Sequence, residues 1–158
     1  MPKNTTNQNN AKFPFDGRYL LIEDGRKVSQ RMNTPLNYKE KLPENCPLPE
    51  SKDVALADVW RLLRSDTPTE SCFESQAAQK IENRKKACEC GWASCSFFEG
   101  DKFTKDLMKL PWCKNFVARA EIQIPLGSGL SKKEGSHVHF WAFDHFSFTK
   151  AIVRVEPR

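Results

Sequence analysis

The sequence predicts an α+β fold, with an N-terminal β-hairpin, two to three helices and a C-terminal antiparallel β-meander packed on the helices. Three observations predict it: an Asp-Gly pair between two apolar arms, helical spacing of apolar residues in the middle of the chain, and alternation near its end. The chain has 158 residues, a length typical of one domain. We expect a polar, disordered tail over residues 1–12 and a single domain over residues 13–158.

The first expected element is a hairpin over residues 18–32. Its turn is the pair Asp24-Gly25, which can adopt the positive φ angles of a tight two-residue connection. Residues 33–52 then carry Pro35, Pro43, Pro47 and Pro49. Since proline lacks a backbone donor and disrupts helices, we expect an irregular surface connection here.

Helical patterns occupy the middle of the chain. Over residues 53–64, apolar side chains recur at the i, i+3, i+4 and i+7 positions of one helix face, namely Leu56, Val59, Trp60 and Leu63. We expect Trp60 to anchor the core from this face. A second helix is expected over residues 67–87, because Thr67, Pro68 and Glu70 resemble an N-cap, a first-turn proline and a capping-box acid. A third is expected over residues 101–110, ending before Pro111.

The last third of the chain alternates as strands do. Residues 116–124 place Ala118, Ala120 and Ile122 on a buried side and send Arg119 and Glu121 outward. A glycine-rich connection over residues 126–136 leads to a second strand over residues 137–143, and a third follows over residues 146–156. In this meander the first two strands are neighbours, and the helices cover the apolar face opposite Arg119 and Glu121.

Charge and hydropathy limit the function classes. The chain has 25 Lys and Arg against 20 Asp and Glu, a net charge of +5 that is compatible with RNA as a partner. No apolar run reaches the roughly 20 residues of a membrane helix, and the polar start MPKNTTNQNN lacks the pattern of an export signal. We therefore expect a cytoplasmic protein with no membrane association.

Six cysteines raise the question of metal binding or disulfides. Without an export signal, we expect reduced thiols. Four of them could ligate zinc, namely Cys88, Cys90, Cys95 and Cys113, but the C-x-C spacing lacks the usual pair of knuckles. The alternative is that they are small buried residues, and we predict no metal. The glycine-rich connection does not fit a phosphate-binding P-loop, and no cofactor is expected.

The candidate site is the polar face of the predicted sheet. His137 and His139 leave the same side of one strand, and Trp141 continues that side. If Glu121 lies on the neighbouring strand, it could act as a general base toward an RNA 2′-hydroxyl, with His139 as the acid. We further predict that Arg119 and Arg154 contact the phosphate and that Trp141 stacks on a base. Lys132 and Lys133 are predicted to contact the substrate from the neighbouring connection. The alternative is a solvated sheet face with a purely structural role.

Residues 90–142 combine a short Ser-x-Phe segment, a helix, V-A-R-A-E-I and S-H-V-H-F-W. This run resembles segments of uncharacterised bacterial proteins, some near toxin or defence genes, and in places it resembles ADP-ribosyltransferase toxin domains. Three functions remain open. The first is a toxin-type endoribonuclease. The second is an ADP-ribosyltransferase-like domain that uses NAD, with Glu121 stabilising an oxocarbenium ion. The third is a non-catalytic partner-binding or inhibitor protein.

Overall fold

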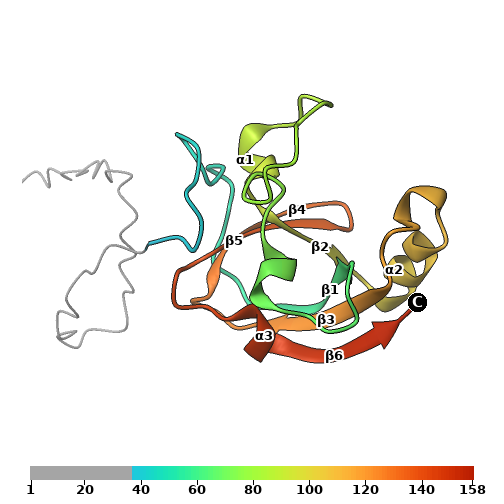
Figure 1. The fold of residues 1–158 in the computed structure, drawn as a ribbon. Coiled ribbons are helices and arrows are strands. Elements are labelled where there is room, and N and C mark those ends of the chain that lie inside the picture. Colours follow the sequence, from blue (N-terminus) through green and yellow to red (C-terminus); the bar gives the residue numbers. More distant parts are fainter. Residues whose placement is uncertain (1–36) are drawn as a thin grey trace, which may run out of the picture. The chain divides into compact units, whose positions relative to one another are not determined.

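The computed structural model describes residues 37–158, which form an α+β unit of a six-stranded antiparallel sheet and short helices (Figure 1). The expected tail over residues 1–12 and the expected hairpin over residues 18–32 lie outside the described residues. The elements, including two 3-10 helices labelled η, are β1 Leu56–Leu63, η1 Glu70–Phe73, α1 Glu89–Trp92, β2 Cys95–Glu99, α2 Asp101–Met108, η2 Pro111–Cys113, β3 Ala118–Ile124, β4 Gly129–Glu134, β5 His137–Ala142, α3 Phe148–Ala151 and β6 Ile152–Pro157.

The strands lie in the order β4-β5-β2-β1-β3-β6 (Figure 1). The predicted meander is therefore wrong in its strand order, because β1 and β2 lie between β3 and β5. Alternation along a strand decides which side chains share a face, but it does not decide which strand lies alongside. The two inserted strands come from segments that the sequence did not mark as strands.

The segment over residues 53–64 is not a helix but contains β1, a central strand of the sheet. Val59 and Leu63 point into the main core, while Trp60 and Leu62 point to the opposite face, and all four are buried. The strand is also irregular at Asp58, whose φ is 52° and where its register against β3 shifts. A strand that is buried on both faces and interrupted by a bulge reproduces the apolar spacing of a helix. The expectation that Trp60 is buried is confirmed.

The predicted helix over residues 67–87 is reduced to η1, followed by turns. Only its first apolar residue, Phe73, is buried, whereas Ala77 and Ile81 are exposed. The backbone reaches positive φ at Lys80 and again at Lys86. Since a short helix depends on burying an apolar face, this segment has nothing to stabilise it as one. The third predicted helix is confirmed as α2, which ends before Pro111.

Strand β3 is confirmed, with Ala118, Ala120, Ile122 and Ile124 all buried. The glycine-rich connection is wrong in part, because residues 129–134 form β4 and pair with β5 around a turn at Gly135, whose φ is 62°. The third predicted strand, over residues 146–156, divides into α3 and β6. Residues 37–52 are irregular as predicted, apart from two isolated bridges to residues 143 and 131.

Both faces of the sheet are covered. The main core lies on one side, where Phe73 and Phe148 stack at 4.9 Å against apolar side chains of five strands. On the other side, Met108 of α2 packs with Leu62 and Cys113. The prediction that helices cover only the face opposite Arg119 is therefore wrong, because α2 covers the face that carries Arg119.

Candidate functional site

A groove of about 660 Å³ lies over the sheet face that carries His137 and His139. Its floor is formed by residues of β1, β2, β4 and β5. Its walls are formed by η1, η2, α1 and the connection that follows η1. Its volume is within the range of sites that take small organic ligands. We call it the histidine groove, and the lining residues used below are Arg61, Arg64, Gln79, Ile81, Ala87, Cys88, Gly91, Trp92, Ser96, Phe98, Trp112, Phe116, Glu134, His137 and His139.

The groove opens where β1 and β2 separate. The two strands pair at Val59–Glu99 and at Trp60–Phe98. One residue further along β1, the Arg61 guanidinium donates to the carbonyl of Ser96 at 2.9 Å. Arg61 also donates to the carbonyls of Cys72 and Glu74, and these bonds hold its positive charge at the wall of the groove.

His137 and His139 lie side by side on β5, with ring centroids 4.3 Å apart. The His137 ring stacks on Phe98 of β2 at 5.3 Å. Burial lowers the pKa of His137 below its ordinary value, and the positive charge of a protonated His139 lowers it further. His137 is therefore a neutral imidazole at pH 7, which can accept a proton.

His139 is oriented from both ring nitrogens. Its Nδ1 lies 2.8 Å from the hydroxyl of the buried Ser94, and that hydroxyl donates to the Gly91 carbonyl at 2.6 Å. Because the Ser94 hydroxyl donates its proton to the Gly91 carbonyl, it can only accept a hydrogen bond from His139. Nδ1 of His139 is therefore the protonated ring nitrogen and donates to the Ser94 hydroxyl. Nε2 lies 3.6 Å from the Glu134 carboxylate. A side chain at residue 91 would approach Cε1 of the His139 ring to 3.1 Å, so glycine leaves room for this orientation.

Glu134 faces His139 as an anion. Its pKa is lowered first by a hydrogen bond from Lys132, whose amino group lies 3.2 Å away, and then by the charge of His139. The three residues meet because β4 and β5 form a hairpin in which Lys132 pairs with His139 and Glu134 pairs with His137. Lys133 points elsewhere and pairs with Glu99 at 2.6 Å.

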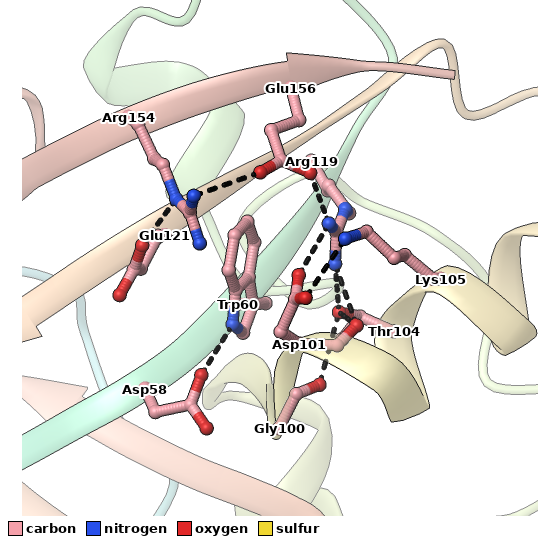
Figure 2. A network of polar contacts seen from close by, with 10 residues as sticks. All are labelled: Asp58, Trp60, Gly100, Asp101, Thr104, Lys105, Arg119, Glu121, Arg154 and Glu156. Atoms are coloured by element: carbon pink, nitrogen blue, oxygen red, sulfur yellow. Dashed lines mark hydrogen bonds and ion pairs between the residues drawn. The ribbon is translucent and has the colours of Figure 1, made fainter.

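The prediction that Arg119 faces solvent is wrong, because its side chain is only 3% exposed. Its guanidinium lies among the side chains of Asp101, Thr104 and Glu156 (Figure 2). Its guanidinium donates to Asp101 at 2.5 Å, to Thr104 at 2.7 Å and to Glu156. It also lies over the Trp60 ring. Because α2 covers this part of the face and supplies two of these partners, Arg119 has a structural role and no access to a substrate.

Glu121 is not brought to the histidines. It pairs with Arg154 of β6 at 2.7 Å (Figure 2), and β1 and β2 lie between its strand and β5. Three strand spacings correspond to about 14 Å, beyond the reach of a direct proton transfer. Trp141 is 2% exposed and donates through Nε1 to the Cys90 carbonyl at 3.1 Å, so its ring is covered by protein.

The prediction that all cysteines are reduced is wrong for Cys46 and Cys90, which form a disulfide. The irregular segment before β1 lies against α1, and this brings their Cα atoms within 5.4 Å. Burial raises the pKa of the Cys95 thiol to about 12, while Cys88 is exposed at the groove.

Among residues 37–158, no three His, Cys, Asp or Glu side chains are grouped so that they could hold a metal ion.

No protein-family model, curated protein or solved structure matches the chain. Within residues 37–158, no helix combines the length and apolar character required to cross a membrane. The candidate site is therefore identified from the geometry of its residues alone. Sequence reasoning found the two histidines but missed residues far away in the chain. Four of these line the groove, namely Arg61, Arg64, Phe98 and Trp112, and the buried Ser94 contacts His139.

Proposed function

We propose that this protein cleaves RNA in the histidine groove, with His137 as general base and His139 as general acid. In this reaction the RNA 2′-oxygen attacks the adjacent phosphorus and the bond from phosphorus to the 5′-oxygen breaks. The 2′-hydroxyl proton goes to His137, and a proton from His139 goes to the leaving 5′-oxygen. The products are a 2′,3′-cyclic phosphate and a 5′-hydroxyl.

The observation that supports this proposal is the pair of imidazole rings, 4.3 Å apart, in two different surroundings. His137 is packed on Phe98 with its pKa lowered, which suits the group that takes up the proton. His139 holds a proton on Nδ1 and faces the Glu134 carboxylate with Nε2, so an added proton on Nε2 has an anionic partner. Two neighbouring titratable groups in different surroundings are typical of acid–base pairs.

The groove also holds positive charge for a phosphate. The Arg61 guanidinium is fixed by three backbone carbonyls, and Arg64 is exposed at the groove near the ring of Phe116, 5.8 Å from its centroid. Such fixed cations stabilise the charge that accumulates on the phosphate oxygens in the transition state. These roles replace those that the sequence assigned to Arg119 and Arg154.

The test is an RNA cleavage assay with analysis of the product ends. We expect cyclic phosphate products, no cleavage of DNA of the same sequence, and a loss of about 10²- to 10⁴-fold in kcat for His137→Gln or His139→Gln. Glu121→Gln is the matched control, because Glu121 is polar, lies on the same sheet and is outside the groove. Equal activity in all three variants, or no cleavage by the wild type, would contradict the proposal.

The other two functions give different results in the same assays. An ADP-ribosyltransferase-like activity would consume NAD and would not require His137 and His139 together. A partner-binding or inhibitor protein would form a stoichiometric complex without turnover. The geometry does not favour the ADP-ribosyltransferase-like activity, because Glu121 is paired with Arg154 away from the groove.

A toxin-type role and a cytoplasmic location belong to the same proposal. If the protein is a toxin that degrades RNA, its expression in bacterial cytoplasm should arrest growth, and His139→Gln should relieve the arrest. Since disulfides are typical of oxidising compartments, the oxidation state of Cys46 and Cys90 in cell extracts bears directly on the location.

A further inference from the structure

One tryptophan side chain is exposed at the groove. Trp112 lines the groove and is 59% exposed, whereas Trp60 and Trp141 are buried, and Trp92, which also lines the groove, is half-buried and donates through Nε1 to the Ile81 carbonyl. It lies in η2 directly before Cys113, which is fully buried and whose carbonyl accepts a bond from Arg158 at 2.9 Å. The ring is therefore presented from a fixed backbone at the edge of the groove.

Positive charge gathers in the connection that forms another part of the groove wall. Gln79, Ile81 and Ala87 of this connection line the groove, and the exposed Lys80, Lys85 and Lys86 are interspersed with them. In the described part of the chain, none of these three lysines forms an ion pair. The anion in the groove, Glu134, already pairs with Lys132. These three lysines are thus charged groups at the groove that have no ion-pair partner among residues 37–158, and their positive charge suits a chain of phosphates.

We infer that the groove binds single-stranded RNA, with one base stacked on Trp112 and the neighbouring phosphates near Lys80, Lys85 and Lys86. This inference rests on the proposed function and names the form of its substrate. An exposed tryptophan can stack only on a base that has left its own stack, and duplex RNA keeps its bases stacked and paired. A basic wall together with an aromatic platform is the arrangement by which proteins hold single strands.

The first experiment measures binding of a single-stranded 2′-O-methyl oligonucleotide, which lacks the attacking hydroxyl, by fluorescence anisotropy. We expect Trp112→Ala to weaken binding by about 5- to 100-fold, the effect of losing one stacked base. Leu126→Ala is the control, because Leu126 is an exposed apolar side chain, 70% accessible, and lies outside the groove. The same sequence as a duplex should bind more weakly and should be insensitive to Trp112→Ala.

The second experiment measures how binding depends on salt. Replacing Lys80, Lys85 and Lys86 together by Gln should reduce the slope of log K against log salt by about 2, since each phosphate contact on a single strand contributes about 0.7. The control triple variant changes Lys102, Lys109 and Lys150 to Gln, which are exposed, lie outside the groove and alter the net charge equally. An equal change of slope in both triple variants would overturn the inference.

The outcomes separate this inference from the proposed function. Binding that depends on Trp112, without cleavage of natural RNA, supports the single-strand groove and overturns the proposed reaction. Cleavage that is unaffected by Trp112→Ala, or duplex binding as tight as single-strand binding, overturns the inference and leaves the reaction standing. Circular dichroism of each variant establishes that it is folded before binding is compared.

Discussion

The guanidinium carbon of Arg119 lies 4.1 Å from the centroid of the Trp60 ring, and both side chains are almost completely buried (Figure 2). The indole is held from its other end as well, since Nε1 donates to the Asp58 carboxylate at 2.8 Å. Arg154 lies over the same ring at 5.0 Å. A residue that looks like a phosphate contact in the sequence therefore joins β3, β6 and α2 around a buried tryptophan.

Arg119→Leu is expected to lower the free energy of unfolding by about 2 kcal/mol, because the hydrogen bonds of the buried guanidinium to Asp101, Thr104 and Glu156 are lost and the buried Thr104 hydroxyl loses a partner. Urea unfolding followed by tryptophan fluorescence measures the change. Arg154→Leu is the matched comparison and should have a smaller effect, since that side chain is 52% exposed. Equal unfolding midpoints for wild type and Arg119→Leu would contradict the structural role.

Glu70 is expected to make stability depend on pH. Burial alone would raise its pKa, but hydrogen bonds from Thr149, Ser147 and Phe148 lower the pKa to about 2. A carboxyl whose pKa is lower in the folded state stabilises the fold above its unfolded value near 4.5. That contribution is lost as the pH falls from about 4.5 to about 2.

Glu70→Gln should therefore be less stable than the wild type at pH 6, by about 1 kcal/mol for the lost charge-assisted bonds. The difference should shrink as both proteins approach pH 2. Urea midpoints between pH 2 and pH 6 measure this convergence. A constant difference over the whole range would mean that the Glu70 carboxylate does not hold the start of α3.

The parts of the fold that the sequence predicts are those with one buried face. In β3, the apolar residues Ala118, Ala120, Ile122 and Ile124 are buried in the core, and polar residues lie between them. The alternation of apolar and polar residues that is typical of a strand is therefore visible in the sequence. In β1 both parities are buried, because Val59 packs on one face and Trp60 on the other. A sequence pattern cannot separate such a strand from a buried helix face.

The site is predictable only within one strand. His137 and His139 share a face because they are two residues apart, which the sequence shows directly. Glu134 could also have been placed beside them, had the turn at Gly135 and Ser136 been recognised as a tight hairpin. Arg61 and Trp112 reach the groove through the order of the strands, which depends on tertiary packing and leaves no local signal.

The disulfide between Cys46 and Cys90 is expected to stabilise the fold, because it closes a loop with a sequence separation of 44. The chain-entropy model gives about 4 kcal/mol for a loop of this length. Urea unfolding with and without a reductant measures the contribution, and Cys46→Ser should match the reduced wild type. Cys72→Ser is the control, since Cys72 is a free thiol. A midpoint that does not respond to reductant would contradict the disulfide.

The acidic limb of the activity profile should report His137. The base must be neutral to accept the 2′-hydroxyl proton, so kcat/KM should fall as the pH drops through the pKa of His137 in the free enzyme. That pKa is expected below 6.5, since burial and the charge of His139 both disfavour the imidazolium. NMR titration of the His137 ring protons measures it independently of activity.

His139→Gln separates the two causes of this low pKa. The substitution removes the neighbouring positive charge but leaves His137 packed on Phe98, so the pKa of His137 should rise and yet stay below 6.5. His145→Gln is the control, because His145 is exposed, bonds to the Gly127 carbonyl and lies outside the groove. If the pKa of His137 is unchanged in His139→Gln, the two rings are not electrostatically coupled, and the assignment of base and acid to this pair loses its physical ground.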